Sequence, residues 1–459
     1  MAPSHKRQLF GMAAFFAAIL ASPTAAERIS VSAGNADLQI VIEAASAGDV
    51  IVLEPGQHRG PIRIDKSLTI EGVPGAILQG NGRGSVVMVE APESVIRGLE
   101  IRGSGMDLEV MDAGVFVKKT ATGAIVEDNV IIDNLYGIYL HGAVDSLARG
   151  NRISGLREGR MNEAGNGVSV WNAPGAKVVD NDISFGRDGI FTIASRRNVF
   201  SGNRFSHVRF AIHYMYTDDS EVSDNVSIGN SVGYAIMYSN RLKITGNVSD
   251  GDRDHGFLFN YANGSEIARN TVLGRLQPMG RWTTAGRQGG IHGVPAAGEP
   301  EQPVAAGATR LGPEKCVFIY NANKNRFSDN WFEGCAIGIH FTAGSEGNRM
   351  SGNAFVGNRN QVKYVGTRHL DWSADGRGNY WSDNPAFDLD GDGKGDNPYR
   401  PNDLIDRVLW TAPQAKVLIN SPAVQVIRWA QSQFPALLPG GVVDNHPLIA
   451  PPVHAPRVQ

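Results

Sequence analysis

The chain has no surplus of basic residues and few charged residues of either sign. Charged side chains make up 19% of its 459 residues, and beyond the first 26 residues 41 basic side chains stand against 46 acidic ones, a formal charge of −5. A protein built to bind nucleic acid offsets the phosphate charge with a basic stripe. We therefore expect no nucleic-acid partner.

Long hydrophobic runs are also missing, except at the N-terminus, so we expect no transmembrane helix elsewhere. Lys6 and Arg7 precede the apolar run Leu9–Ala21, and small residues follow as far as Ala26. This layout is typical of a secretory signal peptide, residues 1–26, and the run is too short to span a bilayer. We expect cleavage near Ala26 and an exported, soluble mature protein; an uncleaved membrane anchor is the alternative.

Cysteine is scarce as well. The only two cysteines, Cys316 and Cys335, could pair as a disulfide in an oxidising compartment. Cys316 could equally be a small buried apolar residue, because free cysteine is among the most buried residue types. The sequence leaves both alternatives open.

What the chain does have is a repeat of about 22 residues. Most intervals between its repeat asparagines are 22 or 23 residues, and a small residue stands 14 positions before seven of them. Two sets of residues in one register, with a period this short, indicate a one-dimensional solenoid. The asparagines are Asn129, Asn151, Asn181, Asn203, Asn225, Asn247, Asn270, Asn330 and Asn353, and the small residues are Gly137, Gly167, Gly189, Ala211, Gly233, Gly256 and Cys316.

Within each repeat, apolar positions alternate with mixed ones. The positions 13 and 11 residues before each asparagine, such as Ile212 and Tyr214, are mostly apolar and should face inward. The intervening positions should face solvent. Short strands between turns predict an all-β fold, a right-handed parallel β-helix with coils of about 22 residues. We expect the asparagines to form an internal ladder, with amides hydrogen-bonded to one another and to turn backbone.

We place the β-helix domain at residues 27–400. At its start, residues 36–47 have helix-like apolar spacing and precede the strand-like run Val50–Leu53. A short amphipathic helix at this point would cover the open apolar end of the solenoid. We therefore expect an N-terminal cap.

The register also shows an interruption and an end. The interval between Asn270 and Asn330 is 60 residues, which predicts an insertion at about 274–312 on the outside of the coil. Residues 401–459 follow the repeats as a C-terminal tail. This tail is either a cap or a docking segment for a membrane partner.

One group of soft metal ligands follows from the register. Met215 and Met237 both stand ten residues before a repeat asparagine, so they should stack on adjacent rungs. His213 lies two residues before Met215 and hence on the same face. Two thioethers and an imidazole suit Cu(I) far better than magnesium or calcium. We predict a copper site at His213, Met215 and Met237; ordinary surface side chains are the alternative.

A second candidate metal site lies after the repeats. Asp388, Asp390, Asp392 and Asp396 alternate with glycines that permit a sharp turn, like the first part of a calcium loop. A glutamate at the twelfth position and flanking helices are missing from the pattern. Calcium is therefore our second metal prediction, and a solvated acidic turn is the alternative.

Catalytic patterns are incomplete. Asp252, Asp254 and His255 form an acidic cluster with a histidine, but no second acid-base partner falls near them in the register. The glycine-rich stretch 80–84 lacks the lysine, hydroxyl residue and helix of a phosphate-binding loop. We expect a binding protein rather than an enzyme.

Two runs near the end carry a family resemblance. The runs GNYWSDN, Gly378–Asn384, and DLDGDGKGDNPYRPNDL, residues 388–404, stand after an asparagine-punctuated β-helix and a signal peptide. Together they resemble the NosD family, periplasmic accessory proteins of nitrous oxide reductase maturation. The resemblance covers essentially the whole mature chain and includes the segment from Leu404 through Phe434.

The resemblance implies a copper-handling protein of the periplasm. Its expected partners are the ABC-transporter subunits NosF and NosY and the nitrous oxide reductase apo-enzyme, with a copper chaperone as a further candidate. Copper, as Cu(I), is the expected cargo. Two other functions stay open: a polysaccharide lyase or epimerase of the β-helix type, and a structural docking protein that binds no metal.

Overall fold

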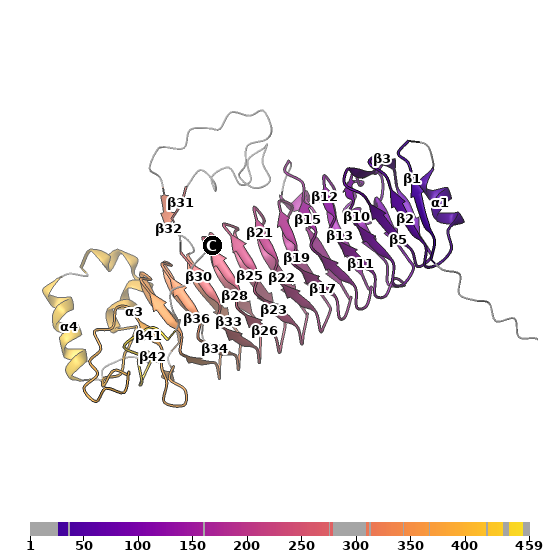
Figure 1. The fold of residues 1–459 in the computed structure, drawn as a ribbon. Helices are drawn as coiled ribbons and strands as arrows, with labels where there is room; N and C mark the ends of the chain where they lie inside the picture. The colour runs from indigo at the N-terminus through magenta and orange to yellow at the C-terminus, as the bar shows by residue number, and fades with distance from the viewer. Residues whose placement is uncertain are drawn as a thin grey trace, which may run out of the picture.

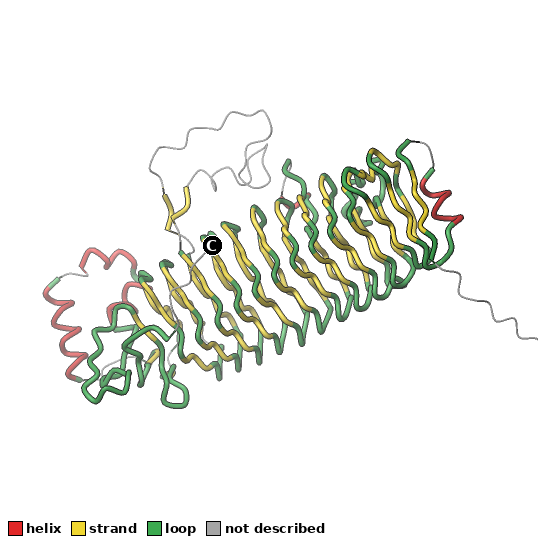
Figure 2. Tube along the Cα trace, viewed as in Figure 1, coloured by secondary structure: helices red, strands yellow, loops and turns green. Residues whose placement is uncertain are grey.

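The computed structural model describes residues 26–34, 37–158, 161–274, 276–278, 309–311, 314–342, 344–366, 368–418, 421–434 and 440–452. These residues form one elongated solenoid whose three parallel sheets run along its length (Figure 1). Each coil passes once through every sheet, and the turns line up along the edges (Figure 2). The predicted right-handed parallel β-helix is confirmed.

The three long sheets are numbered sheet 1, sheet 2 and sheet 3. Sheet 1 has 13 strands: β1 Arg28–Val31, β2 Val50–Leu53, β5 Thr69–Gly72, β8 Val95–Arg97, β11 Ile125–Glu127, β14 Leu147–Arg149, β17 Lys177–Val179, β20 Val199–Ser201, β23 Glu221–Ser223, β26 Lys243–Thr245, β29 Glu266–Ala268, β34 Arg326–Ser328 and β37 Arg349–Ser351. Sheet 2 has 12 strands: β4 Ile62–Ile64, β7 Val87–Val89, β10 Ala113–Val117, β13 Tyr136–His141, β16 Val168–Trp171, β19 Asp188–Ile193, β22 Phe210–Met215, β25 Val232–Met237, β28 His255–Asn260, β33 Lys315–Tyr320, β36 Ile337–Thr342 and β39 Asn360–Val365. Sheet 3 has 13 strands: β3 Gly56–Arg59, β6 Ala76–Gln79, β9 Glu100–Arg102, β12 Val130–Ile132, β15 Arg152–Ser154, β18 Asp182–Ser184, β21 Arg204–Ser206, β24 Val226–Ile228, β27 Val248–Asp250, β30 Thr271–Leu273, β35 Trp331–Glu333, β38 Ala354–Val356 and β41 Tyr380–Trp381.

The core lies between the three sheets and consists largely of the apolar residues 13 and 11 positions before the repeat asparagines. Ile212 and Tyr214 of β22 are fully buried, as are Tyr234 and Ile236 of β25. Small residues are needed 14 positions before the asparagines because neighbouring coils come very close there. A Cβ added to Gly137 would lie 2.4 Å from the carbonyl oxygen of the next coil, so a larger side chain does not fit.

The asparagine ladder runs along the turns between sheets 1 and 3. Asn203 donates from Nδ2 to Oδ1 of Asn225 at 3.0 Å, and Asn225 donates to Asn247 at 2.9 Å. Each amide also donates to backbone, as Asn225 does to Phe200 O at 2.8 Å. The ladder continues unbroken from Asn129 through Asn353, and Asn379 adds a rung beyond the repeat asparagines.

Helices stand at the two ends of the solenoid (Figure 1). Helix α1, Leu38–Ala44, begins at the N-cap Asp37 and buries Leu38 and Ile42, so the predicted amphipathic cap is confirmed. At the opposite end lie α3, Leu404–Thr411, the 3-10 helix η2, Pro413–Leu418, and α4, Pro422–Gln433. Outside the three long sheets and the end helices lie the 3-10 helix η1, Met161–Glu163, and the parallel pair β40, Leu370–Asp371, and β42, Val442–Val443.

The coil ending in β30 is followed in space by the coil that begins with β33. β28 pairs with β33 and β30 with β35, so the solenoid has no gap there. Between them the chain leaves the solenoid through an antiparallel ribbon, β31 Leu276–Pro278 and β32 Thr309–Leu311. The rest of the predicted insertion, and the predicted signal peptide up to residue 25, lie outside the described residues.

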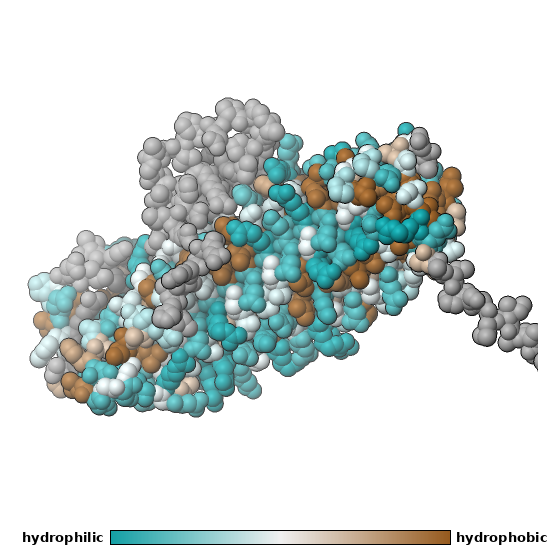
Figure 3. All heavy atoms as spheres, in the orientation of Figure 1, coloured by the Kyte–Doolittle hydropathy of each residue, from teal (hydrophilic) through white to brown (hydrophobic). Residues whose placement is uncertain are grey.

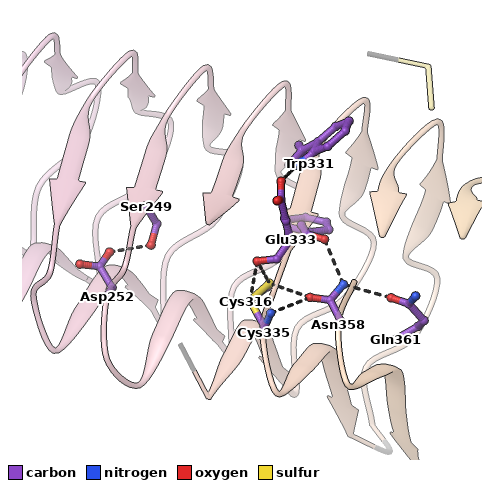
Figure 4. The surroundings of a disulfide bond; sticks show 9 residues. Ser249, Asp252, Cys316, Trp331, Glu333, Cys335, Asn358 and Gln361 are labelled. Atoms are coloured by element: carbon purple, nitrogen blue, oxygen red, sulfur yellow. Dashed lines mark hydrogen bonds between the residues drawn. A yellow bond between two sulfur atoms is a disulfide. The ribbon is translucent and has the colours of Figure 1, made fainter. Parts of the chain in front are cut away.

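The two cysteines form a disulfide in the core of this coil (Figure 4). Cys316 of β33 and Cys335, in the turn after β35, are both fully buried, with a Cα–Cα distance of 5.6 Å. The backbone N–H of Cys335 donates to Oδ1 of Asn358 at 2.9 Å. Of the two alternatives that the sequence leaves open, the structure therefore selects the disulfide.

Most of the face seen in Figure 3 is hydrophilic, and hydrophobic residues gather chiefly over the N-terminal coils. None of the helices in the described part of the chain has the length and apolar character needed to cross a membrane.

Candidate functional site

The candidate site lies on the outer face of sheet 2. A cavity of about 200 Å³ opens there over strands β13, β16, β19 and β22. His213 and Met215, two of the three predicted copper ligands, line it. The other lining residues are Tyr136, Tyr139, Asn166, Ser169, Arg187, Asp188, Phe191 and Arg209.

The register brings the predicted methionines together. Met215 of β22 and Met237 of β25 are direct partners in the parallel pairing of these strands, and such strands lie about 4.8 Å apart. Both side chains are partly exposed. Beside them the rings of Tyr216 and Tyr238 stack at 5.0 Å between centroids. The side chains of Met215 and Met237 therefore leave the same face of the sheet on neighbouring rungs.

His213 projects from the outer face of sheet 2, as the alternation predicts, but neighbouring side chains cover it, so the expected exposure to solvent is not found. Only 8% of its surface is exposed. The ring packs against Phe191 of the preceding strand and Phe210 of its own strand, and each of their ring centroids lies 5.0 Å away. His213 is thus a buried residue at the wall of the cavity.

A buried carboxylate orients the imidazole. Nδ1 of His213 lies 3.0 Å from Oδ2 of Asp188, which begins β19 on the preceding coil. Because an ionised carboxylate only accepts hydrogen bonds, Nδ1 carries the hydrogen. Nε2 is buried and has no hydrogen-bond partner within the described chain. A ring that carries its one hydrogen on Nδ1 presents an unused lone pair at Nε2.

Asp188 is held in its charged form by its partners. Arg209 donates to both of its oxygens, from Nε at 2.8 Å and from Nη2 at 2.7 Å. Burial opposes ionisation, but hydrogen bonds from His213 and Arg209 outweigh it, so the pKa of Asp188 lies below its ordinary value. The guanidinium of Arg209 also lies 4.3 Å above the ring of Phe210. Asp188 and Arg209 thus form a fixed support behind His213.

Sequence reasoning missed this support. Asp188 is 25 residues before His213, so it sits one coil earlier and three positions along the strand. The signal that could have revealed it is an acidic residue directly before the small residue Gly189, at a position where most strands of sheet 2 carry neutral side chains. Arg187 and Arg209 directly precede β19 and β22. The repeat pattern does not predict whether side chains at these positions point inward or outward.

The structure does not bring the other candidate residues from the sequence together in one site. His141 stacks on Trp171 at 4.4 Å, several coils from Met237. Asp252 is fully buried in a turn, where it accepts hydrogen bonds from Ser227, Ser249 and the backbone of Asn230. Asp252 therefore plays a structural part and cannot join His255 in a solvent-reachable site.

The acidic loop brings three of its four predicted calcium ligands together. One carboxylate oxygen each of Asp388, Asp390 and Asp392 lie within 4.8 Å of one another. Asp396 instead accepts from the backbone of Leu389 at 2.8 Å. Lys394 lies 3.0 Å from Asp392, and Asp388 accepts from three backbone N–H groups. The loop is closed by its own hydrogen bonds, and calcium binding stays a prediction.

Comparison with known proteins adds the following. A family model described as "Periplasmic copper-binding protein (NosD)" matches residues 149–386. A Stutzerimonas stutzeri protein named "Probable ABC transporter binding protein NosD" is 39% identical over 400 residues, which cover 87% of this chain and 86% of the relative. A protein of the same name from Pseudomonas aeruginosa PAO1 is 39% identical over 406 residues, 88% of this chain and 89% of the relative. The solved Dettilon tailspike protein has a TM-score of 0.49 at 16% identity, covering 74% of this chain and 69% of its own.

Proposed function

Because the chain belongs to the NosD family, we propose that it binds copper in the periplasm and delivers it for the assembly of the copper centres of nitrous oxide reductase, acting with an ABC transporter. The transporter would consist of the subunits NosF and NosY, and the apo-reductase would be the recipient. A copper chaperone would supply the cargo. The chain itself would bind and transfer copper without a bond-making step.

The observation that carries this proposal is the hydrogen bonding of the two ring nitrogens of His213. Its Nε2 is buried and unpartnered within the described chain, while Nδ1 is bound to Asp188. Histidines that bind metal donate their other ring N–H to a carboxylate or carbonyl in this way, which orients the ring and raises its basicity. Nε2 of His213 therefore has the character of a metal ligand.

The donor set favours Cu(I). Met215 lines the same cavity as His213, and Met237 is its partner on the next rung. Imidazole nitrogen and thioether sulfur are soft or intermediate donors that bind Cu(I) and offer little to hard cations. The thioethers are partly exposed, so a partner protein could exchange its own soft ligands with them stepwise. Such a site suits transfer better than storage.

The C-terminal helices would meet the transporter. Val426, Ile427 and Trp429 of α4 have large exposed fractions, and α4 lies at the far end of the solenoid from α1 (Figure 1). An amphipathic helix with an apolar outer side is suited to a groove in a partner. The relatives' name, ABC transporter binding protein, supports an assignment of this helix to the transporter contact.

Copper titration of methionine variants tests the site. We expect the double variant Met215→Leu/Met237→Leu to bind Cu(I) at least about tenfold more weakly in competition with a chromophoric chelator under reducing conditions, because leucine keeps the volume and removes both sulfurs. Met88→Leu, on the same sheet face but far along the solenoid, is the matched control. Unchanged affinity in the double variant would exclude these ligands.

The transporter contact has a separate test. Val426→Asp/Ile427→Asp should lose co-purification with the membrane-embedded transporter, since each aspartate brings charge into an apolar contact. Copper affinity should not change, because α4 lies apart from the cavity. Retained co-purification would assign the transporter contact to another surface.

A further inference from the structure

The cavity beside His213 has an unbalanced charge. Its charged lining residues are Asp188, Arg187 and Arg209. Arg209 pairs with Asp188 through two hydrogen bonds, and Asp188 accepts a third from Nδ1 of His213. Arg187 has no carboxylate partner among the described residues. One positive charge is therefore left over at the cavity wall.

Arg187 also has an unused buried donor. Its Nε is shielded from solvent and has no acceptor in the described chain. Arginine has no acceptor atoms, so this N–H needs an oxygen from a ligand. The backbone N–H of Arg187 donates to Gly165 O at 2.8 Å, which fixes the start of the side chain. Arg187 therefore brings to the cavity a cation with a buried donor and with no carboxylate partner among the described residues.

The aromatic walls are suited to a small organic ligand. Tyr136 and Tyr139 pack edge to face with centroids 5.4 Å apart, and both line the cavity with Phe191. Burial raises the pKa of both tyrosine hydroxyls, that of Tyr139 to about 12, so they remain protonated and can donate to an anion. Two neutral hydroxyl donors therefore belong to the residues that line the cavity.

We propose that this cavity binds a small monocarboxylate, with Arg187 as its charged partner and Tyr136 and Tyr139 as neutral donors. A carboxylate matches the two-pronged geometry of a guanidinium. It also carries one negative charge, which balances Arg187. A phosphate dianion would add a second charge close to Asp188, and that repulsion would weaken its binding.

One consequence rests on the proposed copper function. A carboxylate bound beside His213 would add a negative charge next to Cu(I), so each ligand should strengthen the binding of the other by the same factor. The carboxylate site itself does not depend on copper, because its residues are Arg187 and the tyrosines. Failure of one assignment would leave the other standing.

The test uses the copper-free full-length protein and acetate as the probe. We expect saturable binding of acetate by calorimetry, and about tenfold or greater loss in Arg187→Gln, which keeps much of the side-chain length but removes the charge. Arg204→Gln, an exposed arginine of β21, is the matched control and should bind like wild type. Phosphate should bind more weakly than acetate.

A measurement on the unaltered protein guards against a variant that fails to fold. Acetate should shift the ring NMR signals of His213, which lines the cavity, and leave those of His58, in β3 near the N-terminal end of the solenoid, unchanged. The proposal is overturned by absence of saturable acetate binding, by equal binding in Arg187→Gln, by tighter binding of phosphate, or by shifts confined to other histidines.

Discussion

Single side chains decide which polar groups on this solenoid are available to a ligand. Asp188 orients the buried imidazole of His213 through Nδ1, and Nε2 has no partner in the described chain. The same carboxylate neutralises Arg209 and leaves Arg187 without a counter-charge. The site therefore depends on one acidic residue that touches no predicted metal ligand except His213.

Asp252 offers a pH-dependent test of another buried carboxyl. Burial raises the pKa of Asp252 to about 6, against opposing hydrogen bonds from Ser249, Ser227 and Asn230. A raised pKa in the folded state means that this group's contribution to stability is greatest below its ordinary value of 3.8 and is lost as the pH rises through about 6. At neutral pH the buried charge is destabilising.

We expect Asp252→Asn to raise the free energy of unfolding near neutral pH by up to about 3 kcal/mol, and the gain to shrink toward about pH 4. The new amide can copy Asn230, which occupies the equivalent turn one coil earlier and donates to Ser227 at 2.9 Å. Denaturant unfolding across this pH range measures the effect, with exposed Asp224→Asn as the control. If the increase in the free energy of unfolding did not vary with pH, it would not come from removal of the buried charge of Asp252.

The coil that begins with β33 directly follows the insertion in the sequence. It resumes the solenoid after the ribbon β31–β32, and its register with β28 has to be re-established across the insertion. The disulfide Cys316–Cys335 ties the first strand of this coil to the turn that ends β35 (Figure 4). Cross-linking a segment of this length lowers the entropy of the unfolded chain.

Removing the disulfide should weaken this coil measurably. We expect Cys316→Ala/Cys335→Ala to lower the free energy of unfolding by about 3 kcal/mol, the loop-entropy value for a closed segment of about 20 residues. A reductant should lower the stability of the wild type and leave the double variant unchanged. Equal stability of the oxidised wild type and the double variant would show that the bond adds nothing.

The molecule as a whole is a stack in which each coil touches only its neighbours. The asparagine ladder gives this stack a continuous line of buried amides, each bonded to the next coil. Stability in such a solenoid is a sum of coil terms and nearest-neighbour terms. A lesion in one rung should therefore act on adjacent rungs and not on distant ones.

Asn225→Ala removes four hydrogen bonds, two accepted from Asn203 and one donated to each of Phe200 O and Asn247. We expect a loss of about 3 kcal/mol or more, because buried donors and acceptors are left unpaired. Exposed Asn81→Ala is the control.

Pairs of ladder variants test the nearest-neighbour rule. The losses of Asn151→Ala and Asn330→Ala, which lie many coils apart, should add when combined. The double variant Asn225→Ala/Asn247→Ala should lose less stability than the two single losses added together. The side-chain hydrogen bond between these residues is lost in either single variant and can be lost only once. Denaturant unfolding measures both, and additivity in both pairs would contradict a ladder of coupled rungs.

Much of this architecture follows from the repeat alone. The 22-residue spacing predicts the sheets, the ladder, the close-packed small residues and the pairing of Met215 with Met237, because a parallel stack repeats each position on every coil. The cap α1 follows from local amphipathicity. Such features depend on regular backbone pairing, which a period in the sequence expresses directly.

The environment of His213 was decided only by the tertiary structure. Asp188 approaches it diagonally from one coil earlier, and Phe191, Phe210 and Arg209 cover it, so an outward position became a buried one. The disulfide, too, needed two sulfurs brought together from a strand and a distant turn. Spacing along the chain predicts which residues share a rung, whereas side-chain packing between rungs determines what is covered, charged or free to bind.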